Sequence, residues 1–168
     1  MRVPGIGSPR AVLRAALTSL RETFGEVRAS EIWESAPVGP SQRLYANAAA
    51  VVGADQTPDD VLARLQEIEH RFGRRHLGQR WRARPLDLDI VLWSGGAFKA
   101  RQVVIPHPLW QDRLFVTGPS AQIAGHWRDP RTGKTVAQTH ARLTRPRPMP
   151  SAARGVWALS SVGRATDF

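Results

Sequence analysis

Apolar residues recur at three- and four-residue spacing in two segments, and this pattern predicts two amphipathic helices. The first helix is expected over 9–24, because Ser8 supplies an N-cap, a proline follows it, and Gly25 supplies a stop. The second helix is expected over about 58–72, after the capping residue Thr57. Both stripes of apolar residues indicate helices that bury one face against a common core.

Shorter segments alternate between apolar and polar residues, which is typical of half-buried strands. Strands are expected over 26–34, 45–52, 86–90 and 103–105, turns over 94–96 and 129–133, and a last short helix over 135–143. This mixture predicts one α+β domain over 1–143.

The chain changes character at Thr144, where arginines alternate with prolines. Proline prevents helix and central-strand hydrogen bonding, so residues 144–168 are expected to form a disordered tail. The 168 residues include no cysteine, which excludes disulfides and thiolate chemistry. No apolar run approaches the ~20 residues of a membrane span. A cytoplasmic protein without a membrane partner is therefore expected.

Two acids lie two residues apart in the segment Leu86-Asp87-Leu88-Asp89-Ile90. On a strand the apolar side chains would point one way, and both carboxylates would point the other. Carboxylates held so close repel each other unless a cation lies between them, and Mg²⁺ prefers such oxygen ligands. An amphipathic strand with an acidic outer face explains the same pattern, so the two acids alone do not decide the function.

A basic run over 71–84 precedes the two acids and holds six arginines and no acidic residue. Arginine binds phosphate oxygens through a planar fork of donors. A cationic loop beside a metal-binding carboxylate pair is what polyphosphate transfer requires. A solvated basic loop or a nucleic-acid contact remains an alternative. This run and residues 141–168 together account for the net charge of +10.

Four motifs in order along the chain resemble those of the 6-hydroxymethyl-7,8-dihydropterin pyrophosphokinase family. They are Tyr45-Ala46-Asn47, the segment Trp81 to Ile90 with Arg84, Asp87 and Asp89, Ile105-Pro106-His107-Pro108, and Arg113-Leu114-Phe115. The resemblance extends over about 8–143. The chain departs from the family pattern at Arg82, where the family usually has a small residue, and in a short beginning before Pro9.

The resemblance implies a ferredoxin-like three-layer α/β/α fold with a mainly antiparallel sheet. It also implies transfer of pyrophosphate from ATP to 6-hydroxymethyl-7,8-dihydropterin in folate biosynthesis, with two Mg²⁺ ions. By resemblance, Asp87 and Asp89 hold the metal, and Arg74, Arg84 and Arg113 are catalytic. Gln66, Trp81, Ile90 and His107 would bind ATP, and Ser35, Val38, Tyr45, Asn47 and Phe115 would bind the pterin.

Two other functions fit parts of the sequence. One is a basic nucleic-acid-binding module, and the other is a nucleotidyltransferase that uses the same pair of acids. The pyrophosphokinase is preferred because four motifs occur in register, and the charge lies in one loop and one tail instead of a domain face, unlike a nucleic-acid module. A monomer that binds small molecules, and not nucleic acid, is expected.

Deletion of residues 151–168 should change neither the melting temperature nor turnover with ATP and the pterin. The proline-rich junction gives this tail no means of packing against the domain. Any weak, salt-sensitive binding to nucleic acid should fall, because each cation engaged with phosphate adds to affinity. Thermal denaturation and a turnover assay test this, and an earlier melting transition would place the tail inside the domain.

Overall fold

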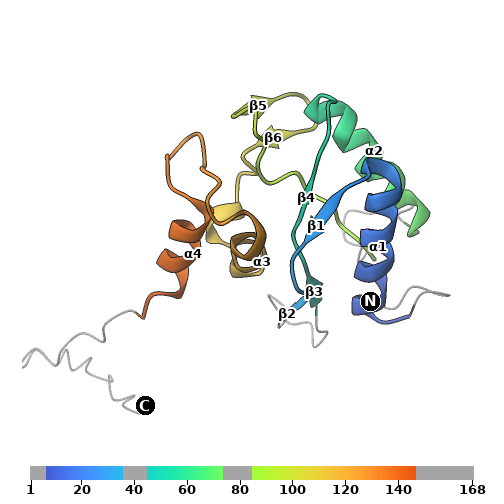
Figure 1. The fold of residues 1–168 in the computed structure, drawn as a ribbon, viewed down its shortest axis with the longest axis horizontal. Coiled ribbons are helices and arrows are strands. Elements are labelled where there is room, and N and C mark those ends of the chain that lie inside the picture. The colour runs from blue at the N-terminus through green and yellow to red at the C-terminus, as the bar shows by residue number, and fades with distance from the viewer. Residues whose placement is uncertain (1–6, 36–44, 74–84, 147–168) are drawn as a thin grey trace, which may run out of the picture.

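A computed structural model describes residues 7–35, 45–73 and 85–146, and the account below concerns these residues (Figure 1). The helices are α1 (Pro9–Phe24), α2 (Pro58–Arg71), α3 (Leu114–Ala124) and α4 (Val136–Thr144), with the 3₁₀ turn η1 (Trp110–Asp112). The strands are β1 (Val27–Ala29), β2 (Trp33–Ser35), β3 (Tyr45–Asn47), β4 (Ala50–Val52), β5 (Phe98–Lys99) and β6 (Val104–Ile105). Where the chain is described, its helices lack the length and apolar character of a membrane span.

The two predicted amphipathic helices are confirmed, together with their capping residues. The Ser8 hydroxyl accepts the N–H of Ala11 at the start of α1, and Gly25 ends that helix at a φ of 78°. Thr57 caps α2 and accepts the N–H of Asp60. The apolar stripes meet in one core, which contains Val12, Ala16, Leu20, Leu65, Ile68, Phe72 and Leu86. The spacing of the sequence therefore specified which faces are buried.

Four of the strands form one interrupted antiparallel ribbon. β1 pairs with β4, and β2 pairs with β3, so two predicted long strands are each divided in two. The division occurs at Ser30, whose N–H donates to the carbonyl of Ala49 and whose hydroxyl accepts the N–H of Ala49, both at 2.9 Å. A side chain thus replaces a ladder bond where the strand breaks.

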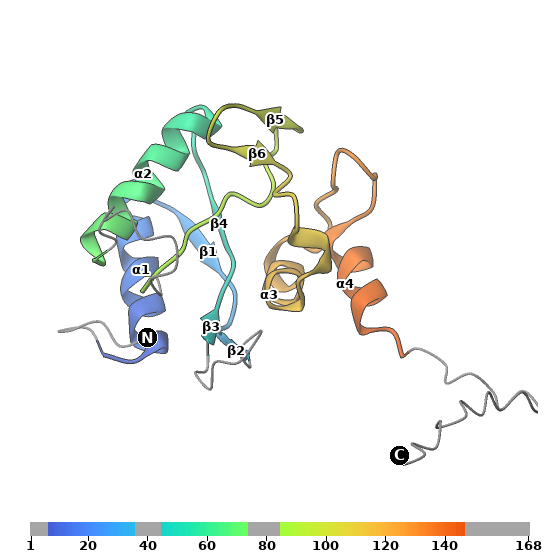
Figure 2. The ribbon, with the colours of Figure 1, turned by 180° about the vertical axis from the view of Figure 1, so that it is seen from behind.

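Helices lie on both sides of this ribbon, as Figures 1 and 2 show. Helix α1 contacts β1, β3 and β4, whereas α3 contacts β2, β3 and β4 from the other side. The sequence did not predict α3, because Gly118 and Pro119 lie inside it. It is stable because it is packed on both sides, with Thr117, Gly118 and Pro119 all buried.

The predicted strand over 86–90 is wrong, because residues 86–93 belong to no strand of the described chain. Their burial still alternates, since Leu86 is buried and both Asp87 and Asp89 are exposed. The N–H of Leu88 donates to the Glu69 carboxylate at 2.8 Å instead of to a neighbouring strand. The chain is therefore held by a side chain at the position where a ladder bond was expected.

The later local predictions are confirmed. The turn over 94–96 closes with a 3.1 Å bond from the N–H of Gly96 to the carbonyl of Trp93, and β6 covers most of the strand expected over 103–105. The turn over 129–133 closes in the same way, and α4 follows the capping box of Thr135 and Gln138.

The α+β class is confirmed, because the described chain combines helices with antiparallel strands. The described strands form three two-stranded sheets and no continuous sheet. A ferredoxin-like order of strands consequently stays a prediction. The boundary after 143 also stays a prediction, although α4 ends close to it at Thr144.

Gly118→Ala should destabilise the fold, because a Cβ there would lie 2.6 Å from Cη2 of Trp33. Overpacking of this kind costs about 1–3 kcal/mol of unfolding free energy. Gly53→Ala is the matched control, since its Cβ would meet no atom within 4 Å. Urea unfolding of both variants measures the difference, and equal stabilities would show that Trp33 moves aside without cost.

Candidate active site

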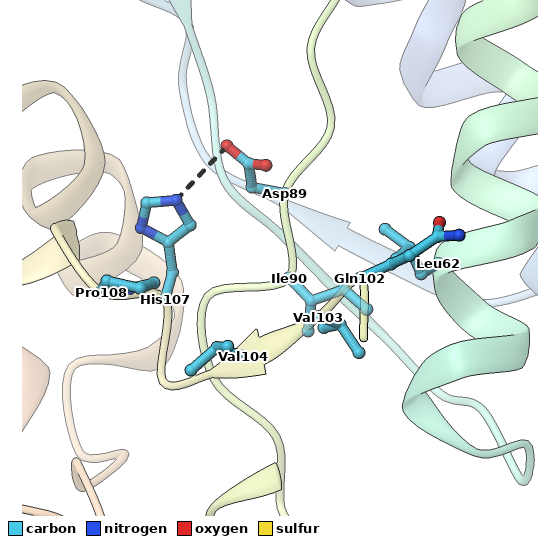
Figure 3. Close-up of a pocket in the computed structure, with 8 residues that line it drawn as sticks. All are labelled: Leu62, Asp89, Ile90, Gln102, Val103, Val104, His107 and Pro108. Carbon is cyan, nitrogen blue, oxygen red and sulfur yellow. Dashed lines mark ion pairs between the residues drawn. The ribbon is translucent and has the colours of Figure 1, made fainter. Parts of the chain in front are cut away.

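A cavity of about 280 Å³ lies between α2, the extended segment after Leu88, and the chain around β6. Its lining residues are Leu62, Asp89, Ile90, Gln102, Val103, Val104, His107 and Pro108 (Figure 3). Three of them, Asp89, Ile90 and His107, were predicted as site residues from the sequence. Asp89 and His107, which are 18 positions apart in the chain, thus line one cavity.

The side chains of Asp89 and His107 point toward each other at this cavity (Figure 3). The His107 Nε2 lies 4.0 Å from the Asp89 Oδ2, and their side chains are 24% and 53% exposed, so a ligand can reach both. The His107 Nδ1 accepts the N–H of Leu109 at 3.3 Å. Because Nδ1 is an acceptor, a neutral His107 carries its proton on Nε2, the atom that faces Asp89. His107 can therefore donate a hydrogen bond into the cavity.

Two contacts fix the segment that carries the acids. The Leu88 N–H donates to the Oε1 of Glu69, a residue of α2 that is only 1% exposed. Three residues later, the carbonyl of Val91 accepts the N–H of His107 at 3.0 Å. The two acids are thereby positioned relative to α2, and His107 is positioned relative to the acids.

Glu69 is the residue that the sequence reasoning missed. Leu65, Glu69 and Phe72 follow helical spacing, so the acid occupies a position of the buried stripe. An acid in a buried stripe is a usable signal, because a buried carboxylate requires donors. Read from the sequence alone, it was placed beside the stripe and given no role.

The carboxylates suit Mg²⁺, although they do not form a complete site. Asp87 and Asp89 are both exposed and offer hard oxygen ligands. Among the described residues, no cluster of three acids, histidines or cysteines could hold a metal. Mg²⁺ commonly binds one or two carboxylates and takes its other ligands from water and substrate phosphates, so the pair fits this mode of binding.

The predicted ring-binding residues lie elsewhere. Tyr45 is 49% exposed and lines a second cavity of about 130 Å³ with Ser8, Pro9, Arg10, Glu34 and Ala46. Asn47 lies opposite Trp33 in the β2–β3 ladder, and Ser35 lies opposite Tyr45. Phe115 is half-buried at the start of α3, with the guanidinium carbon of Arg113 5.8 Å from its ring centroid.

Neither of these two cavities is lined by both Tyr45 and Phe115, so the proposed sandwich around the ring stays a prediction. Gln66 is half-buried on α2, one turn after the cavity residue Leu62. The predicted site residues Val38, Arg74, Trp81 and Arg84 lie outside the described residues.

An exposed carboxylate pair and a hydrogen-bond-donating histidine beside an open cavity are typical of phosphoryl-transfer enzymes. Comparison with known proteins is more specific. A sequence model of the family described as 7,8-dihydro-6-hydroxymethylpterin-pyrophosphokinase matches residues 5–125. The chain belongs to this family.

Three relatives are named 2-amino-4-hydroxy-6-hydroxymethyldihydropteridine pyrophosphokinase. The protein from Synechocystis is 39% identical over 128 residues, which are 75% of this chain and 65% of the relative. The Bacillus subtilis protein is 34% identical over 121 residues, 70% of this chain and 72% of the relative. The Pseudomonas aeruginosa protein is 36% identical over 130 residues, 74% and 78% of the two chains. The resemblance found in the four motifs is confirmed.

Glu69→Ala should lower the free energy of unfolding by roughly 1.5–3 kcal/mol, the usual contribution of a hydrogen bond to a charged group. The variant leaves the Leu88 N–H without its carboxylate acceptor. Glu69→Gln keeps one acceptor oxygen and nearly the same volume, so its loss should be smaller. Urea unfolding measures both. Equal stability of wild type and Glu69→Ala would mean that this contact does not hold the segment in solution.

Proposed function

We propose that the chain transfers the β,γ-pyrophosphate of ATP to the hydroxymethyl group of 6-hydroxymethyl-7,8-dihydropterin, with release of AMP. A bond forms between the hydroxymethyl oxygen and the β-phosphorus, and the bond from that phosphorus to the oxygen of the α-phosphate breaks. The hydroxyl proton is released to solvent, and AMP leaves with the former bridging oxygen. The observation that carries the proposal is the cavity where Asp89 and His107 meet, in a chain of this family.

On the phosphate side, Asp87 and Asp89 would hold two Mg²⁺ ions, which would neutralise charge on the triphosphate. His107 donates its Nε2–H to a phosphate oxygen, and Ile90 packs against the nucleotide. The shared cavity of Asp89, Ile90 and His107 supports these roles. The position of Gln66 one helical turn from Leu62 supports its contact with ATP. Trp81, Arg74 and Arg84 complete this side of the site.

On the pterin side, Tyr45 and Phe115 stack on the ring, and Asn47 binds its edge through the amide. The packing of α3 on β3 supports this arrangement, because Phe115 lies in the first turn of α3 and the other two residues are the ends of β3. Ser35 and Val38 line the same slot. Arg113 lies against the Phe115 ring, which supports a role beside the ring in neutralising the transferred phosphates.

The proposal includes a ferredoxin-like three-layer fold and a monomer that acts in the cytoplasm. The helices on both sides of the strand ribbon support the layered fold. No described feature favours the nucleic-acid module or the nucleotidyltransferase. Titration with ATP, Mg²⁺ and the pterin distinguishes them, because only the pyrophosphokinase converts both substrates and releases AMP.

Asp89→Ala should fold normally and lose more than about nine-tenths of its turnover, a change of over about 1.4 kcal/mol in the activation free energy. The Asp89 side chain is 53% exposed and its ion pair with His107 is long, at 4.0 Å, so stability should change little. Asp55→Ala, at an exposed aspartate outside the cavity, is the control. Full activity of Asp89→Ala would remove this residue from the metal site.

A further inference from the structure

The turn η1 connects two residues that the proposed function places on the phosphates, His107 and Arg113. The carbonyl of His107 accepts the N–H of Trp110 at 3.2 Å, and the carbonyl of Trp110 accepts the N–H of Arg113 at 3.4 Å. Trp110 itself is fully buried. A displacement of Trp110 would therefore move both phosphate-side residues.

A buried carboxylate holds this turn. Asp129 is fully buried, and its Oδ2 accepts the Trp110 Nε1–H at 3.3 Å and an N–H of the Gln111 amide. Its Oδ1 accepts the N–H of Arg131 at 2.7 Å, and the Arg131 guanidinium lies 3.8 Å away. A buried carboxylate is stable only when donors satisfy its oxygens. Asp129 therefore requires Trp110 and Gln111 in these positions.

The hairpin that carries Asp129 is itself restrained. The N–H of Asp129 donates to the carbonyl of Lys134 at 2.9 Å, and its carbonyl accepts the N–H of Gly133 at 2.8 Å. Helix α4 adds a second restraint on η1, because Arg142 donates to the Gln111 carbonyl at 3.1 Å, whereas its ion pair with the exposed Asp112 is screened by water and adds little. These restraints come from residues after 125, where the match to the family model ends.

We propose that Asp129 is a positioning residue for the phosphate side of the active site. It fixes η1 from behind and so sets the relative positions of His107 and Arg113. The inference rests on the proposed function for its catalytic consequence, but the local rigidity of 107–113 can be measured without any substrate.

The decisive variant is Asp129→Asn. An amide has one acceptor oxygen, whereas donors approach both oxygens of Asp129, so one set of donors must lose its acceptor. Asp112→Asn is the matched control, because it changes an acid of the same region whose side chain is 72% exposed and whose ion pair is screened by water.

Hydrogen exchange followed by mass spectrometry provides the first measurement. In Asp129→Asn the amides over 107–113 should exchange faster, while those of α1 and α2 keep the wild-type rates. Asp112→Asn should match the wild type throughout. Faster exchange over the whole chain would show loss of global stability only, and unchanged exchange over 107–113 would show that Asp129 does not hold the turn. Either result overturns the inference.

Kinetics below the melting temperature provide the second measurement. Asp129→Asn should lower kcat or raise KM for ATP by about tenfold or more, because small misplacements of catalytic groups are costly. The KM for the pterin should change less. An equal rise in the KM for ATP and the KM for the pterin would contradict a role on the phosphate side.

If Asp129→Asn does not fold, Gln111→Ala can replace it, because it removes one donor from the Asp129 Oδ2. The same changes in hydrogen exchange and kinetics are expected, but they should be smaller. If the wild-type protein does not transfer pyrophosphate, the proposed function is wrong. Hydrogen exchange would still decide whether Asp129 fixes the turn.

Discussion

The hydrogen bond from the Leu88 N–H to the buried Glu69 carboxylate is the constraint on which the site depends. The segment around Leu88 has no strand partner within the described chain, so sheet hydrogen bonds do not fix it. Its place is set by the burial of Leu86, by Glu69 on α2, and by the bond between Val91 and His107. Packing of α2 in the core and the position of the acids are consequently coupled. A mutation in the core can change the site without touching it.

Local rules explain what could be predicted of the fold. Ser8, Gly25 and Thr57 act within a few residues of the helix ends that they fix, so their effects can be read along the chain. Helix α3 could not be predicted, because its stability comes from packing between distant elements. Its Gly118 leaves the space that the ring of Trp33 occupies. The prediction of a strand over 86–90 was wrong for a related reason. Alternation predicts an extended chain, but it does not identify the group that receives each backbone N–H.

The site was predictable where chemistry is visible in the residue type. Asp89 and His107 were identified through motifs, and the structure brings them to one cavity. Leu62 and Val103 line the same cavity, but in the sequence such residues look like ordinary core. Glu69 lies between these two cases. The sequence shows an acid within the apolar stripe, but it does not show the contact of that acid with Leu88. The contribution of Asp129 depends on residues near 110, which no local pattern connects to it.

The two halves of the proposed site come from different parts of the fold, and α3 connects them. Ring-binding residues are proposed on β3, whereas the phosphate side follows Leu88 and extends to Arg113. Helix α3 begins directly after Arg113 and packs on β2, β3 and β4. Because α3 packs on the strands and η1 is held by Asp129 and Arg142, the distance between the two proposed halves of the site is set by packing within the protein. Such an arrangement can hold the proposed binding residues in place before either substrate binds, so that the hydroxyl and the phosphorus atom are aligned once both are bound, which is how orientation lowers the barrier to transfer.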